Sequence, residues 1–106
     1  MSDFMQERNK QHVFFEEKMP DVAQNFNGLM DIVFKDGSLS SKTKELIALG
    51  ISVAVRCEPC MNYHIEKAIS LNATNDEILE AMSVGFEMGV GQLIPPLRKV
   101  IYERLK

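Results

Sequence analysis

The sequence predicts an all-α domain of five or six helices, and three kinds of observation support this. Apolar residues recur at helical spacings of three and four, most clearly between residues 22 and 33. Prolines and hydroxyl-bearing residues stand where helices are expected to begin. No segment shows a convincing strand pattern, and no repeat, linker or low-complexity segment divides the chain. Residues 1–106 are therefore interpreted as a single domain.

A first helix is expected within residues 3–18, where apolar side chains stand among charges, and the sequence does not mark its ends. Pro20 suits the first position of the next helix, because the backbone N–H that proline lacks has no partner there. That helix carries one apolar stripe and is expected to run to about Phe34. Gly37 is suited to a left-handed cap at its carboxyl end.

Ser40 and Ser41 both qualify as the cap of the third helix, and Ser41 is the better fit to the start of its charged first turn. Residues 46–55 then form an uncharged run without a clear polar face. A helix that is apolar all round is predicted to be buried. Gly50 lies inside this run and is expected to permit close packing against a neighbour.

Pro59 is tolerated in the first turn of a helix and not later. A fourth helix is therefore expected to begin at about Cys57 or Glu58, and Asn72 can close it.

Thr74 and Glu77 have the spacing of a capping box, which predicts the start of a fifth helix. Small residues in this segment are interpreted as close helix contacts: Gly85, Gly89 and Gly91. They lack the preceding strand and the Lys-Ser/Thr ending of a phosphate loop. The proline pair at 95–96 is expected to start the last helix.

Composition excludes some classes of function. A net charge of −3 and a pI near 5.3 argue against a nucleic-acid-binding protein, which needs a basic stripe. The polar amino-terminal segment lacks a secretory signal, and the longest uncharged run is too short to span a bilayer. A cytoplasmic location is therefore expected, with no membrane partner. The small size limits the core, which favours association with further copies of the chain.

Both cysteines fall in one C-x-x-C pair, Cys57 and Cys60, and His64 follows four residues after Cys60. Positions three and four apart share a helix face, so the two sulfurs should be able to cycle between dithiol and disulfide. The amino end of a helix stabilises an anion, and the thiolate is the reactive form of cysteine. His64 is placed to act as base or relay for the Cys60 proton.

Glu45 is expected to reach His64 from the preceding helix. If the two helices pack antiparallel about a turn near Arg56, Glu45 lies eleven residues before that turn and His64 eight after it. At ~1.5 Å of rise per residue the two depths differ by only about 5 Å, which a glutamate side chain can bridge. A partly buried carboxylate needs a partner, and His64 is available. The residues thus suggest a Glu–His–Cys proton relay.

Glu45, the pair Cys57-x-x-Cys60 with His64, and the helix start at residues 72–78 together resemble the alkylhydroperoxidase D (AhpD)-like branch of the carboxymuconolactone decarboxylase family. The resemblance covers roughly residues 20–91. It implies an all-helical fold, trimers or hexamers, and thiol-dependent peroxidase or disulfide reductase activity without a cofactor. The substrate would be a peroxide or a disulfide, and the reductant a dithiol or a protein.

The same resemblance implies roles for single residues. Cys60 matches the peroxidatic cysteine, Cys57 the resolving cysteine, and Glu45 and His64 the proton relay. AhpD proper has a histidine between its cysteines, whereas Pro59 stands there in this chain, which removes one relay member. The decarboxylase branch lacks the cysteine pair, which disfavours lactone decarboxylation.

Other interpretations remain open at this point. The same four residues, Glu45, Cys57, Cys60 and His64, are acceptable zinc ligands, so a non-enzymatic, redox-responsive or metal-bound oligomer is the alternative. A further interpretation is that the cysteines are two core thiols and that Glu45 is a first-turn acid favoured by the helix dipole. His12 is interpreted as a surface residue, and Tyr63 is assigned either to the site or to a subunit interface.

Overall fold

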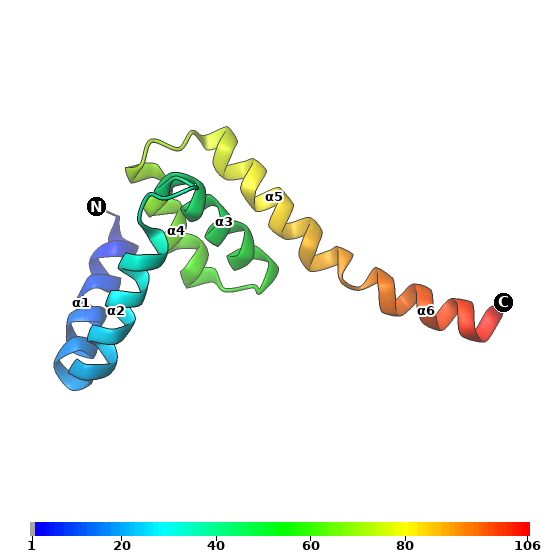
Figure 1. The fold of residues 1–106 in the computed structure, drawn as a ribbon, viewed down its shortest axis with the longest axis horizontal. Coiled ribbons are helices and arrows are strands. Elements are labelled where there is room, and N and C mark those ends of the chain that lie inside the picture. Colours follow the sequence, from blue (N-terminus) through cyan, green and yellow to red (C-terminus); the bar gives the residue numbers. More distant parts are fainter. Residues whose placement is uncertain (1) are drawn as a thin grey trace.

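Six α-helices make up most of residues 2–106, the part of the chain described by this computed structural model (Figure 1). They are α1 (Asp3–Lys18), α2 (Pro20–Phe34), α3 (Ser41–Ala54), α4 (Glu58–Ser70), α5 (Asn75–Gly91) and α6 (Ile94–Leu105). The described residues contain no strand. The predicted all-α class is confirmed.

Helix α3 lies at the centre and packs against α4 on one side and α5 on the other, while α1 and α2 form a hairpin beside α4 (Figure 1). Three buried apolar side chains with accessibilities of 0–6% form the central cluster of the core: Leu49, Ala68 and Ile78. They come from α3, α4 and α5, so the core fixes the positions of these three helices relative to one another.

Two predictions about the segment between α2 and α3 are wrong. Ser40 caps α3, not Ser41: its backbone is extended and its Oγ accepts a hydrogen bond from the Thr43 N–H at 3.0 Å. Ser41 is already helical, and its N–H donates to Asp36 Oδ1 at 2.7 Å. Gly37 makes no left-handed cap, because α2 ends in an extended residue and no glycine of the described chain has a positive φ.

The other helix boundaries follow the prediction. Cys57 is the N-cap of α4, and Arg56 before it adopts a left-handed conformation with φ of 59°. Asn72 closes α4 with φ of 67°. Left-handed backbone is costly for most residues and is tolerated best by asparagine among side-chain-bearing residues, which explains the choice at position 72.

The predicted capping box of α5 is present. Thr74 Oγ1 accepts from the Glu77 N–H at 3.1 Å, and Glu77 Oε1 accepts from the Thr74 N–H at 2.9 Å. The Lys42 ammonium also lies 2.9 Å from Glu77 and links α3 to the start of α5. The hydrogen bond from the Thr74 backbone, followed by that from Lys42, holds the pKa of Glu77 below its usual value.

Two glycines let α3 and α5 approach each other. A Cβ at Gly85 would overlap the backbone carbonyl of Gly50, and a Cβ at Gly50 would lie 3.1 Å from the Ala81 carbonyl oxygen. Gly89 also faces α3, where a Cβ would make an ordinary contact of 3.5 Å with Ala54 Cα. The close contacts predicted for Gly50, Gly85 and Gly89 are therefore confirmed. Gly91 differs, since the only neighbour within contact is the side chain of Glu87 in its own helix.

Helix α3 is not buried on all sides within one chain, contrary to the prediction. Its buried face consists of Glu45, Leu49 and Ser52, spaced as one helical stripe. On the opposite side Ile47 and Ile51 are 47% and 57% exposed. The apolar side chains on this second face of α3 are therefore exposed on the surface of the chain.

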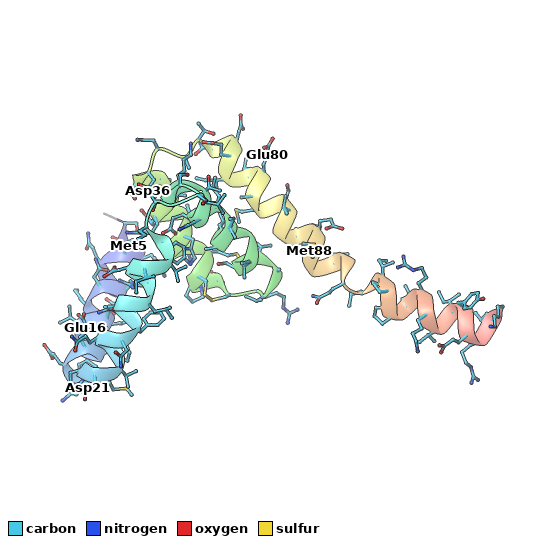
Figure 2. The ribbon with its side chains drawn as sticks, viewed as in Figure 1. Met5, Glu16, Asp21, Asp36, Glu80 and Met88 are labelled. Carbon is cyan, nitrogen blue, oxygen red and sulfur yellow. A yellow bond between two sulfur atoms is a disulfide. The ribbon has the colours of Figure 1, made fainter. Side chains whose placement is uncertain are left out.

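The polar sequence around His12 predicted a surface residue with no partner, and this prediction is wrong. The His12 side chain is 20% exposed, and its Nε2 lies 2.9 Å from Asn27 Oδ1. Asn27 Nδ2 also donates to Glu16 Oε2 at 2.8 Å, so the three side chains join α1 to α2. Glu16 is labelled in this hairpin in Figure 2.

Helix α6 extends away from the other helices, beyond the end of α5 (Figures 1 and 2). It contributes no buried residue, and its main contact is with α5. An isolated helix of this length is marginally stable in water. Among residues 2–106, no helix has the length and hydrophobicity needed to cross a bilayer.

Candidate active site

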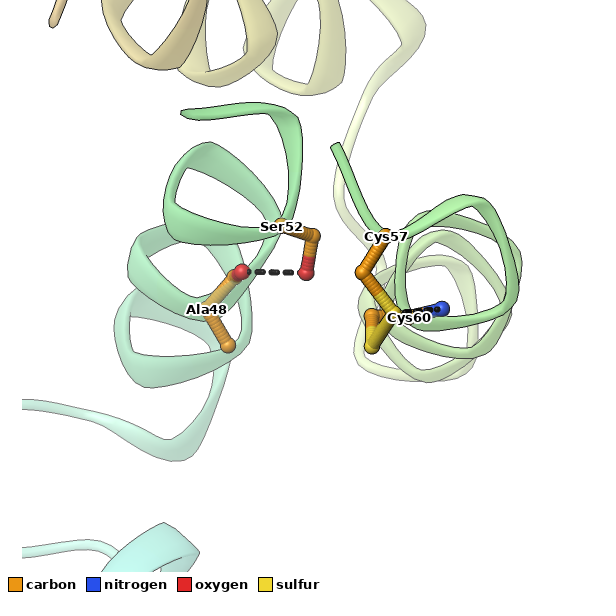
Figure 3. Close-up of a disulfide and its surroundings, with 4 residues drawn as sticks. All are labelled: Ala48, Ser52, Cys57 and Cys60. Carbon is orange, nitrogen blue, oxygen red and sulfur yellow. Dashed lines mark hydrogen bonds between the residues drawn. A yellow bond between two sulfur atoms is a disulfide. The ribbon is translucent and has the colours of Figure 1, made fainter. Parts of the chain in front are cut away.

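The two cysteines form a disulfide at the amino end of α4 (Figure 3). Cys57 is the N-cap and Cys60 lies in the first turn, with their Cα atoms 5.2 Å apart. Cys57 Sγ also accepts a hydrogen bond from the Cys60 N–H at 3.3 Å. The sequence-based expectation that the two sulfurs lie close enough to bond is confirmed. Both sulfurs lie where unpaired helix N–H groups stabilise negative charge, which favours a thiolate after reduction.

Glu45 and His64 are joined across α3 and α4. Glu45 Oε2 lies 2.7 Å from His64 Nδ1, and the glutamate side chain is 3% exposed. The proximity expected from the matched depths of the two helices is therefore present. When Nδ1 donates its proton to the carboxylate, Nε2 of a neutral imidazole is left as the proton acceptor. A buried carboxylate also stabilises the imidazolium that forms once Nε2 takes a proton.

Aromatic rings hold the imidazole from two further directions. The Phe34 ring stacks against His64 with centroids 5.6 Å apart, and the Tyr63 ring meets it edge-on at 5.1 Å. Tyr63, whose location the sequence left open, therefore borders the site. These contacts restrict the imidazole to the orientation that the Glu45 hydrogen bond requires.

Cys60 and His64 line the same cavity, of about 440 Å³, between α1, α2 and α4. Its walls are mainly apolar and are completed by Phe4, Arg8, Phe26, Leu29, Met30, Val33, Phe34, Pro59 and Tyr63. Glu45 instead lines a second cavity of about 270 Å³, which also contains Asp31, Lys35 and Lys67. The hydrogen-bonded pair thus lies between an apolar cavity lined by Cys60 and a second cavity lined partly by charged side chains.

Ser52 is a buried polar residue that the sequence analysis missed. It is 4% exposed, its Oγ donates to the Ala48 carbonyl at 2.7 Å, and its own carbonyl accepts from the Cys57 N–H at 2.9 Å. In Figure 3 its side chain lies on the face of α3 turned toward Cys57. Its spacing of seven from Glu45 was the available signal, since both positions share one helix face.

The cavity walls from α1 and α2 were also missed, and no sequence signal marks them. Phe4, Arg8 and Phe34 lie far from the cysteine pair along the chain, and only the tertiary fold brings them to it.

The four predicted site residues form two bonded pairs, not a metal centre. Cys57 is bonded to Cys60, and Glu45 is hydrogen-bonded to His64. Within the described chain, no three His, Cys, Asp or Glu side chains are arranged to hold a metal ion. This geometry gives the zinc alternative no ligand set.

Comparison of the sequence with known proteins identifies one family. The model of the carboxymuconolactone decarboxylase family matches residues 20–93. An uncharacterized protein of Cupriavidus necator is 33% identical over 85 residues, which cover 80% of this chain and 75% of the relative.

Two solved structures extend this likeness to the fold. A family protein from Legionella pneumophila has a TM-score of 0.75 at 35% identity, covering 81% of this chain and 77% of its own. Another from Thermotoga maritima, for which a part in the antioxidative response has been suggested, has a TM-score of 0.73 at 29% identity, covering 94% and 85%. The chain belongs to the carboxymuconolactone decarboxylase family and has an AhpD-like core.

Proposed function

We propose that the protein is a thiol-dependent peroxidase that reduces organic hydroperoxides through Cys60. One observation carries this proposal: a cysteine pair at a helix amino end shares a cavity with a histidine that is hydrogen-bonded to a buried glutamate. This arrangement supplies a nucleophile, a proton acceptor beside it and a group that orients the acceptor.

The chemistry follows in balanced steps. His64 accepts the Cys60 thiol proton, and the thiolate attacks the terminal oxygen of a hydroperoxide ROOH. The O–O bond breaks, Cys60 becomes a sulfenic acid, and the alkoxide leaves as ROH with the proton from His64. The Cys57 thiol then attacks the sulfenic sulfur, forming the disulfide and releasing water. An external dithiol returns the disulfide to two thiols by exchange.

A partner disulfide is the second candidate for the oxidant. The cavity favours the hydroperoxide, because an apolar hollow of about 440 Å³ is of the size that encloses a small molecule. Regeneration needs a supply of dithiol, so the cytoplasm, where thiols are kept reduced, is the location we propose.

Intact-mass measurement tests the function. The reduced protein treated with one equivalent of cumene hydroperoxide is expected to lose two hydrogens per chain, and a dithiol should reverse the change. With excess dithiol, hydroperoxide should be consumed over many turnovers. A protein that keeps both thiols and consumes no hydroperoxide would contradict the proposal, and zinc bound at one per chain would favour the alternative.

Further copies of the chain are the partners we propose for its exposed apolar surface, in a trimer or hexamer. Helix α6 buries nothing, and a groove of about 500 Å³ between α3 and α5 is lined by Ile47, Ile51, Val84 and Met88 among others. Exposed apolar surface on this scale marks an interaction site.

Light scattering tests the assembly. The purified protein should have the mass of three or six chains, and Leu97→Glu in α6 should lower that mass, because a carboxylate cannot be buried without a partner. Lys99→Glu is the matched control on the same helix, at a position 72% exposed, and should leave the mass unchanged. A wild-type protein of single-chain mass would refute the assembly.

A further inference from the structure

Among the described residues that line the cavity beside Cys60 is a cationic side chain that takes no part in the reaction proposed above. Arg8 of α1 lines this cavity, and its guanidinium carbon lies 4.5 Å from the centre of the Tyr63 ring. Tyr63 is three residues after Cys60, on the same helix. The stacking therefore holds the guanidinium about one helical turn along α4 from the reactive sulfur.

Arg8 has hydrogen-bonding capacity to spare. Its Nη1 donates to Asn9 Oδ1 at 3.2 Å, and a guanidinium carries five N–H donors. No carboxylate of the described chain lies within ion-pair distance of it. His64, the other titratable base on the cavity wall, is already paired with Glu45. Among the described residues, the cavity thus offers an apolar surface with one cationic side chain, Arg8, available to bind an anion.

We propose that the substrate is an amphiphilic hydroperoxide, with a hydrocarbon chain that fills the cavity and a carboxylate that pairs with Arg8. Carboxylates bind guanidinium groups by two parallel hydrogen bonds, and a hydrocarbon chain is stabilised by apolar walls. The hydroperoxide group lies several carbons from the carboxylate, at Cys60. This inference rests on the proposed function and adds the class of substrate to it.

The source of Arg8 makes it a determinant of specificity rather than of the reaction. Helix α1 lies before residues 20–93, which the family model matches. The cysteine pair, Glu45 and His64 all lie within the matched segment. The chemistry and the recognition of the carboxylate therefore come from different parts of the chain, and they can be tested separately.

Two substrates that differ only in charge provide the first test. Linoleic acid hydroperoxide is expected to exceed its methyl ester in kcat/KM by about tenfold to a hundredfold, as for a charge-assisted hydrogen bond. In Arg8→Gln this acid-to-ester ratio should fall to near one. Lys10→Gln removes an exposed charge from the same helix and should keep the wild-type ratio. A wild-type ratio near one, or a ratio that survives Arg8→Gln, would overturn the proposal.

A binding measurement separates this proposal from the proposed function. Linoleic acid and its methyl ester, which carry no peroxide, are titrated into the Cys57→Ser/Cys60→Ser protein below their micelle-forming concentration. Calorimetry should show the acid binding at least tenfold more tightly than the ester, and this preference should be lost with Arg8→Gln. If hydroperoxides are not turned over but the preference is found, the peroxidase function fails and the recognition stands. Equal binding of acid and ester refutes the recognition whatever the activity.

Discussion

Cys60→Ser is expected to lower hydroperoxide turnover by roughly 10³-fold or more, because it removes the attacking sulfur and leaves only binding and orientation. The variant should also form no intramolecular disulfide, since a serine hydroxyl cannot replace the sulfenic acid intermediate. Turnover is measured by loss of hydroperoxide with excess dithiol, and the oxidation state by intact mass.

Cys57→Ser is the matched variant, because the two sulfurs lie at the same helix end and have different proposed steps in the reaction. It should react once with hydroperoxide and gain one oxygen as a sulfenic acid, without closing a disulfide. If instead Cys60→Ser takes up the oxygen and Cys57→Ser does not react, the roles of the two cysteines are reversed. Equal activity of both variants with the wild type would exclude a reaction at this pair.

His64→Ala is expected to slow the oxidation of Cys60 by roughly 10²- to 10⁴-fold at neutral pH, the usual range for loss of a general base. The rate is followed as loss of free thiol under single-turnover conditions. His12→Ala is the control, since the other histidine of the chain lies in the α1–α2 hairpin, hydrogen-bonded to Asn27. Similar losses in both variants would mean that His64 acts only by supporting the fold.

The sequence was sufficient for the fold class, for the starts of α2, α4, α5 and α6 to within a residue or so, and for the pairing of Glu45 with His64. These features depend on local chemistry: proline at a first turn, a capping box, and helical rise counted from one turn. The prediction of Ser41 rather than Ser40 as the cap of α3 was wrong because the cap depends on the path of residues 35–39, where Asp36 accepts a hydrogen bond from the Ser41 N–H. The two adjacent serines are chemically identical, so their identity does not predict which of them makes that contact.

Burial was less predictable than helix position. The apolar run in α3 suggested a helix surrounded by its own chain, yet Ile47 and Ile51 are exposed. Hydrophobicity predicts that a helix face is buried, but it does not show whether another helix of the same chain or a second chain packs against that face. The cavity wall from Arg8 and Phe34 was unpredictable for a related reason, because it arises only when the α1–α2 hairpin docks on α4.

The central claim is that His64, held by Glu45, manages the proton of Cys60. Its most direct test is the rate of alkylation of Cys60 by iodoacetamide as a function of pH, in the reduced Cys57→Ser protein with and without His64→Ala. The account predicts that loss of the imidazole moves the midpoint of the profile to higher pH, because the thiolate loses the imidazolium that forms when His64 takes its proton and that stabilises its negative charge. Superimposable profiles would show that the imidazole does not act on this sulfur.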